Sequence, residues 1–400
     1  MGAADDPPEE TPQATLLVEL ATDLYDLGID TDRTAFAVHK DRPSIALPIK
    51  GAFRVDLAKA FYRRFGRAPG GGALTDAQTT LQGIAGEREP VTLHLRVGRH
   101  GSDVYLDLGR PDGKMVRITR GRWAITTESP LLFRRTQLTS ELPIPQRGGS
   151  LQELRTRLNV TDASWPIVLG WLVAAFIPGK PHPILLLGGQ QGVGKSTAAR
   201  LLIVLIDPSP APLRSPPSNA RQWAITASAS WCFCVDNVSE IKAWWSDALC
   251  KAVTGDGWLD RALFTDSDVS VLSFQRVIAF TSIDTGALRG DLGERVLLAD
   301  LEPIAPDQRR TEEELLKDYE AARPLLLGAL LDLVALVLQE LPRTKSESLP
   351  RMADFAALLQ AMDRVAGTDA FQTYIDQDAR IAEDVVQSDA VAMAILNLVE

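Results

Sequence analysis

The chain has 400 residues, 45% hydrophobic and 24% charged, a composition that excludes a globally disordered protein and allows a core in two or three domains. The net charge of −10 argues against a protein that only coats nucleic acid. The charge is uneven, however, because residues 36–150 hold nineteen Lys and Arg against ten Asp and Glu. Cys232, Cys234 and Cys250 have neither the number of a disulfide framework nor the spacing of a zinc site, so we interpret them as small buried apolar residues.

The first residues, MGAADDPPEE, are acidic and contain proline, whereas a secretory leader is basic and then apolar. Two apolar runs resemble membrane spans, but residues 165–178 are too few, and residues 324–342 include Asp332, Gln339 and Glu340. We therefore expect a cytoplasmic protein with no membrane partner.

Residues 1–14 are expected to form a flexible acidic tail. Apolar spacing then predicts helices over residues 15–27, 55–65 and 75–84, and alternation predicts short strands over residues 91–126, with a hairpin turn at Pro111–Gly113. Together these elements predict a small α+β domain over residues 15–148. Its basic content is suited to DNA docking or to a collar, but the same charge could contact the protein's own acidic ends.

Three further segments follow this domain. A helical collar is predicted over residues 149–181, a nucleotide-binding core over residues 182–304, and a helical region over residues 305–400. The apolar helices at residues 165–177 and 323–341 could pack inside one chain or between subunits, because periodicity does not distinguish the two arrangements.

The segment ILLLGGQQGVGKST matches the GxxxxGK[ST] pattern of a phosphate-binding loop, with an apolar strand before it and a helix after it. In such a loop, backbone N–H groups and a helix N-terminus converge on phosphate, the lysine neutralises charge and the serine hydroxyl binds magnesium. The predicted ATP-binding residues are Gly189, Gln190, Gln191, Gly192, Val193, Gly194, Lys195, Ser196 and Thr197.

WCFCVDNVSE supplies the apolar strand and terminal acid that such sites use to hold magnesium, and this makes Asp236 the second predicted metal residue after Ser196. The alternative is that Asp236 is only a turn residue. Asn237 stands where many ring ATPases have a glutamate that polarises the attacking water, and an amide cannot accept that proton. Glu240 or Asp236 must then act as the base, or turnover is slow.

The order of these motifs, followed by KAVTGDGWLDRALFTD and the apolar strand RVIAFTSID, resembles the superfamily 3 helicases over about residues 150–360. These are the ring helicases of viruses, phages and plasmids, and they include poxvirus-type and phage primase-helicases and ATP-binding proteins of actinobacterial mobile elements. The resemblance implies an AAA+-like α/β P-loop core.

In that family a β-hairpin between the acidic strand and the next strand grips single-stranded DNA, so the resemblance implies that Lys251 and Arg261 face nucleic acid. Arg261 could instead pair with Asp260, Asp266 or Asp268 on a solvated hairpin. The resemblance also gives Thr281 the position of the sensor of the γ-phosphate, although the family more often has asparagine there.

GALRGDLGERVLLADLEPI resembles the family's stretch in which an arginine reaches the neighbouring subunit's phosphate. A guanidinium is suited to that role because it is always charged and presents a planar fork of donors. Arg295 is the first candidate and Arg289 the second, and either could instead pair with Asp291 or Glu294 of its own chain.

These features predict an ATPase, with ATP and Mg²⁺, that moves as a hexameric ring along single-stranded or forked DNA in replication of a mobile element. A primase or replication initiator is an expected partner. Nucleotidyl transfer by the chain itself is not predicted, because Asp103 and Asp107 lie four residues apart on a strand and do not form a polymerase acid pair. The alternative is a nucleotide-controlled switch, in defence or regulation, that hydrolyses ATP slowly and does not move on DNA.

Overall fold

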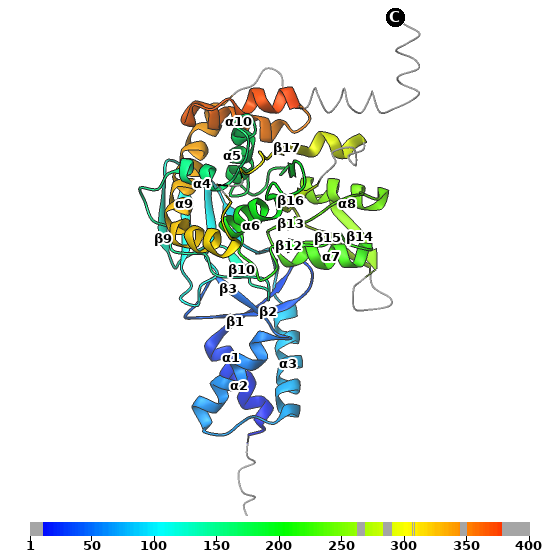
Figure 1. Cartoon of the computed structure of the whole chain (residues 1–400). Coiled ribbons are helices and arrows are strands. Elements are labelled where there is room, and N and C mark those ends of the chain that lie inside the picture. Colours follow the sequence, from blue (N-terminus) through cyan, green and yellow to red (C-terminus); the bar gives the residue numbers. More distant parts are fainter. Residues whose placement is uncertain are drawn as a thin grey trace, which may run out of the picture. The chain divides into compact units, whose positions relative to one another are not determined.

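The computed structural model describes residues 11–261, 269–282, 290–305, 307, 309–344 and 350–377. The chain forms two compact units (Figure 1). The N-terminal unit extends to His94 and includes Thr127–Arg135, and the C-terminal unit contains Leu95–Thr126 and the chain from Thr136 onward.

The N-terminal unit is a six-stranded mixed sheet, in the order β4-β1-β2-β3-β10-β5, with three helices. One core joins the three helices to strands β1 and β2, and Phe53, Leu57 and Phe61 of α2 are fully buried in it. The elements of this unit are α1 (Gln13–Leu24), β1 (Tyr25–Asp30), β2 (Ala35–His39), β3 (Ile45–Pro48), α2 (Ala52–Phe65), α3 (Gly71–Gly86), β4 (Pro90–Val91), β5 (Leu93–His94) and β10 (Leu132–Arg134).

The C-terminal unit contains a four-stranded antiparallel sheet, a five-stranded parallel sheet and a β-hairpin. Its strands are β6 (Val97–His100), β7 (Asp103–Asp107), β8 (Met115–Thr119), β9 (Arg122–Thr126), β11 (Ile184–Gly188), β12 (Leu213–Arg214), β13 (Cys232–Val235), β14 (Gly257–Arg261), β15 (Val269–Ser273), β16 (Val277–Thr281) and β17 (Val296–Asp300). Its helices are α4 (Leu151–Arg157), α5 (Trp165–Ala174), α6 (Lys195–Ile206), α7 (Ala220–Ala229), α8 (Ala243–Thr254), α9 (Glu312–Glu340) and α10 (Ala353–Ala366), with 3₁₀ turns η1 (Gly290–Arg295) and η3 (Leu341–Arg343).

The parallel sheet has the order β12-β13-β16-β11-β17, so β16 lies between β11 and β13. The described residues of these strands are almost all buried, as expected for a parallel sheet covered on both faces. Because parallel strands end at one edge, the loops after β11, β13 and β16 meet there.

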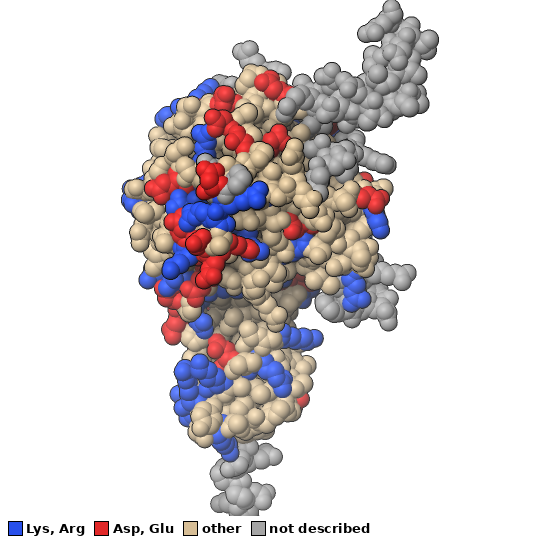
Figure 2. All heavy atoms as spheres, in the orientation of Figure 1, with Lys and Arg blue, Asp and Glu red and all other residues tan. Residues whose placement is uncertain are grey.

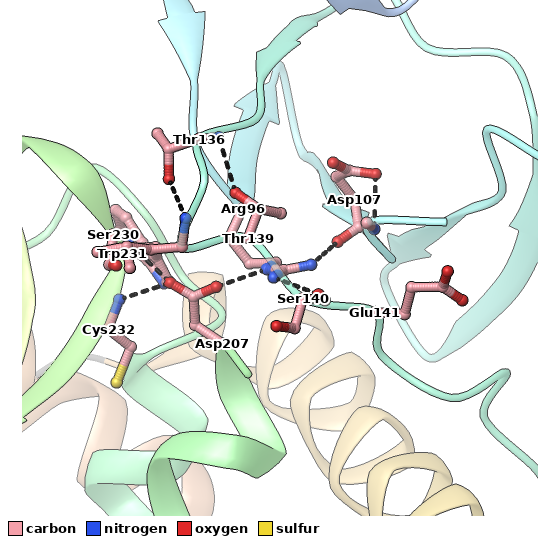
Figure 3. A network of polar contacts seen from close by, with 12 residues as sticks. Arg96, Asp107, Thr136, Thr139, Ser140, Glu141, Asp207, Ser230, Trp231 and Cys232 are labelled. Atoms are coloured by element: carbon pink, nitrogen blue, oxygen red, sulfur yellow. Dashed lines mark hydrogen bonds and ion pairs between the residues drawn. The ribbon is translucent and has the colours of Figure 1, made fainter. Parts of the chain in front are cut away.

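The expected domain boundary at residue 148 is wrong, because β6–β9 belong to the C-terminal unit. The buried Arg96 donates from Nε to Asp207 Oδ1 at 2.7 Å, from Nη1 to the Asp107 carbonyl at 2.9 Å and from Nη2 to the Ser140 carbonyl at 2.8 Å (Figure 3). Asp207 caps the end of α6 and accepts N–H bonds from Trp231 and Cys232 at the start of β13. This network ties the antiparallel sheet to the parallel one.

Helix α9 begins with a capping box, in which the Thr311 side chain accepts from the Glu314 N–H and the Glu314 side chain accepts from the Thr311 N–H. Its apolar residues pack in the core of the C-terminal unit, and every residue of α5 is buried there too. Both apolar helices therefore contribute to the core of one chain. Within the described residues α9 with η3 is the one helix long and apolar enough to span a membrane, and 67% of that apolar window is buried inside the protein.

Some element predictions were wrong at the N-terminus. The first helix ends at Leu24, and Tyr25 already begins β1; strands β1, β2 and β3 were not predicted. The predicted hairpin turn is confirmed, since Pro111–Gly113 joins the antiparallel strands β7 and β8. Cys232 and Cys234 are buried as expected, and Cys250 is partly buried.

Candidate functional site

The loop between β11 and α6 has the backbone geometry of an anion cradle. Gly189, Gly192 and Gly194 have φ values of 132°, 85° and 82°, a region that other residues rarely adopt. Gly194 directly precedes the first residue of α6, so the unpaired N–H groups of the helix N-terminus lie at the loop. Of the other predicted binding residues, Gln190 and Gln191 are exposed, Val193 is buried and Thr197 is half-buried.

The Lys195 side chain folds back over this loop. Its Nζ donates to the carbonyl oxygens of Gly189 at 2.6 Å and Gln190 at 2.8 Å. Partial burial lowers the pKa of Lys195, and the nearby Asp236 carboxylate opposes that shift. The Lys195 Nζ therefore lies against the first two residues of the loop.

Three side chains from separate elements meet at the carboxyl edge of the sheet. Asp236, directly after β13, accepts at Oδ1 from Ser196 Oγ at 2.8 Å and from Thr281 Oγ1 at 2.6 Å. The Thr281 hydroxyl also accepts from the Asn237 N–H at 2.8 Å. The structure thus brings together the two predicted metal residues and the predicted sensor, and Asp236 has a defined place in the site instead of being a free turn acid.

The donor chemistry of this cluster fits magnesium. A hydroxyl and a carboxylate oxygen 2.8 Å apart form an all-oxygen set, which hard cations prefer. Among the described residues no group of three His, Cys, Asp or Glu could hold a metal on its own.

Asn237 and Glu240 are both exposed on the loop after β13. Asn237 has a φ of 57°, in the left-handed region that asparagine tolerates better than most residues. Its backbone is fixed by the bond to Thr281, and the following Val238 N–H donates to the Thr281 carbonyl. Glu240 is the first carboxylate along the chain after Asp236. Unlike Asp236, it is not bonded to Ser196 or Thr281.

Asn159, between α4 and α5, was not predicted to belong to the site. Its Nδ2 donates to the carbonyl of Val193 in the loop at 2.5 Å and to the carbonyl of Glu302 after β17 at 2.7 Å. The Glu302 N–H returns a bond to the Asn159 carbonyl at 2.8 Å. Asn159 therefore fixes the loop against the segment that follows β17, and no motif in the sequence signalled it.

The arginine candidates have different outcomes. Arg295, at the end of η1, pairs with Asp291 of its own chain at 2.6 Å and also donates to the Asp291 carbonyl. Arg351 pairs with both Asp291 and Glu294. The intrachain alternative is thus the arrangement seen for Arg295, whereas Arg289 lies outside the described residues.

The expected β-hairpin is present as β14 paired antiparallel with β15, and Arg261 is the last residue of β14. The side chain of Arg261 lies outside the described part, as do Asp266 and Asp268. Lys251 is exposed in the last turn of α8, before the hairpin and not on it.

Residues 152–384 match the sequence family described as actinomycete integrative conjugative element replication protein. The chain belongs to this family. The matched residues include the loop, Asp236, Thr281 and Asn159. No curated protein matches the chain.

Solved structures similar to this replication protein include the C-terminal region of NrS-1 and a JCV helicase. The C-terminal region of NrS-1 has 14% identity and a TM-score of 0.40, over 85% of this chain and 76% of that one. A JCV helicase structure has 14% identity and a TM-score of 0.28, over 58% of this chain and 65% of that one.

Proposed function

We propose that this replication protein is an ATPase of the superfamily 3 helicase kind, which uses ATP and Mg²⁺ to move on DNA during replication of the element. The observation that carries the proposal is the cluster of Ser196, Asp236 and Thr281 beside Lys195 and the glycine loop. A nucleoside triphosphate requires this combination of backbone donors, one cation and an oxygen-lined metal position.

Each residue then has a distinct task. The loop N–H groups and Lys195 bind phosphate oxygens, so the lysine exchanges its carbonyl partners for the substrate. Ser196 and Asp236 hold magnesium, which when bound neutralises charge on the transferred phosphoryl group. Thr281 orients the Asp236 carboxylate and ties it to Asn237, so a change at the phosphate can reach the loop after β13.

We further propose that Arg295 acts on the phosphate of a neighbouring subunit in a ring. In the single chain Asp291 neutralises this guanidinium, and the Arg295 side chain is only 13% exposed. Assembly must therefore exchange the Asp291 pair for a phosphate. Such an exchange makes hydrolysis depend on the neighbouring subunit.

A switch with slow hydrolysis is the second candidate function, and two observations favour it. Asn237 cannot accept a proton from water, and Arg295 is already paired within its own chain. In this case ATP is retained and the energy is used for assembly instead of movement.

Titration of wild type, Lys195→Ala and Asp236→Asn with a fluorescent ATP analogue, with and without Mg²⁺, tests the site. We expect Lys195→Ala to lose binding under both conditions and Asp236→Asn to lose only the part that depends on Mg²⁺. Unchanged binding in Lys195→Ala contradicts the proposal.

A further inference from the structure

Helix α2 presents an exposed face that is both basic and apolar. On a helical wheel its buried residues Phe53, Leu57 and Phe61 lie on one side, and Val55, Lys59, Tyr62 and Arg63 lie on the opposite side. We call these last four residues the α2 stripe. Val55 is 71% exposed and Tyr62 is 59% exposed, and both lie on the same side of the helix as Lys59.

Among the described residues, Arg54 is the one cation of residues 50–70 that makes polar contacts, donating to the side chain of Gln78 and the carbonyl of Gly71. Residues 50–70 hold six Lys and Arg but one acid, Asp56, and that acid already interacts with Tyr25 and Arg42. In the part of the chain that the structure describes, the side chains of Lys59, Arg63, Arg64 and Arg67 make no hydrogen bond or ion pair. Figure 2 shows basic side chains gathered on this unit with few acidic ones among them.

Helix polarity alone does not account for this arrangement. Cations in the last turn are stabilised by the helix dipole, and this explains Arg63 and Arg64. It does not explain Lys59 in the turn before, nor the two exposed apolar residues. The stripe instead combines cations with an aromatic ring, which together bind phosphates and stack on bases.

We infer that the α2 stripe is a binding surface for single-stranded nucleic acid. Lys59 and Arg63 lie on the same flank of Tyr62 and contact backbone phosphates, and the Tyr62 ring stacks on an unpaired base. Val55 lies about two helical turns from Tyr62 on the same side of the helix and extends the apolar surface. The inference rests on the proposed function, since it assigns a strand-holding surface to the N-terminal unit of a protein that acts on DNA.

Binding of a fluorescein-labelled oligodeoxythymidine to the full chain, measured by anisotropy over a salt series without nucleotide, tests the inference. Lys59→Ala/Arg63→Ala should reduce the slope of log K against log salt by about 1.4, because each lost phosphate contact on a single strand removes about 0.7. Tyr62→Ala should weaken binding about tenfold with the slope unchanged, and Tyr62→Phe should keep wild-type affinity.

Lys317→Ala is the matched control, because Lys317 is an exposed lysine of α9 in the other unit. Thermal unfolding of each variant identifies any that fail to fold. If one alanine variant of α2 fails to fold, the DNA binding of the remaining folded α2 variants is still compared with that of Tyr62→Phe and Lys317→Ala. Wild-type slope and affinity in the folded α2 variants overturn the inference. Equal binding of polyglutamate, lost in the same variants, also overturns it in favour of an acidic protein partner.

The result is separable from the ATPase proposal. If Lys195→Ala and wild type both hydrolyse no ATP while the α2 variants still lose DNA binding, the stripe stands and the motor does not. If DNA-stimulated hydrolysis is found while the α2 variants bind normally, the motor stands and the stripe does not.

Discussion

Asn159 illustrates how a residue outside any motif can hold a phosphate loop in place. Replacing Asn159 with alanine removes two hydrogen bonds. The backbone carbonyl of Val193 then has lost the Asn159 donor. At about 1 kcal/mol per bond, we expect the KM for ATP to rise about tenfold or more while kcat changes little.

Steady-state hydrolysis of Asn159→Ala over a range of ATP concentrations measures this effect. Asn219→Ala is the control, since Asn219 caps α7 through the Gln222 N–H and its loss should cost about 1 kcal/mol of stability with no change in KM. A wild-type KM in Asn159→Ala rules out the positioning role.

His182 is expected to make the stability of the protein depend on pH. It is buried before β11 against Trp231, and neither ring nitrogen has a hydrogen-bond partner. Burial lowers the pKa of His182 to about 3, so the folded protein keeps it neutral. Unfolding restores a pKa of about 6.5, so the unfolded state takes up a proton as the pH falls below that value and the folded state does not.

Stability therefore decreases between about pH 6.5 and pH 3 through this group, by about 2 kcal/mol between pH 7 and pH 5. Denaturant unfolding of wild type and His182→Leu at both pH values should show a smaller loss in the variant. Equal losses in the two proteins mean that His182 does not contribute to acid sensitivity.

At the scale of elements, the Arg96–Asp207 network should decide whether β6–β9 stay attached to the parallel sheet. Arg96→Met leaves the buried Asp207 carboxylate without its cation, which costs about 3–5 kcal/mol. Arg117→Ala breaks the exposed pair with Asp103 and should cost less than about 1 kcal/mol. Chemical denaturation measures both, and a similar small cost in the two variants argues against the network.

The sequence predicted the elements whose signals are local. The glycine loop and its flanking strand and helix, Asp236 after β13 and the turn at Pro111–Gly113 are each encoded within a few neighbouring residues. Strand β1 was not predicted because Gly28 and two aspartates disfavour a strand. Cross-strand packing overrides that preference, since a Cβ at Gly28 would lie 2.5 Å from the Phe36 ring.

The role of Asn159 and the domain boundary were not predicted, because both depend on contacts between residues far apart in the sequence. Asn159 meets Val193 at 34 residues' separation, and Arg96 meets Asp207 at 111. No spacing rule links residues so far apart, so the boundary placed at residue 148 was wrong although strands over residues 91–126 were predicted. The intrachain pair of Arg295 with Asp291 was an open alternative because the two are four residues apart.

At the scale of the whole molecule, the proposed motor requires more than one chain. Arg295 is paired with Asp291 in the single chain, so full activity should appear only when a neighbouring subunit draws it away. A switch needs no such exchange. Ring assembly and DNA stimulation are therefore the properties that separate the two candidate functions.

The decisive measurement is steady-state ATP hydrolysis over a protein concentration series, with and without single-stranded DNA, and with Arg295→Ala mixed into wild type. The account predicts stimulation by DNA, a concentration-dependent onset, and a loss on mixing that exceeds the variant's share of the protein. Slow hydrolysis that ignores both DNA and protein concentration, with a loss on mixing merely proportional to dilution, contradicts it.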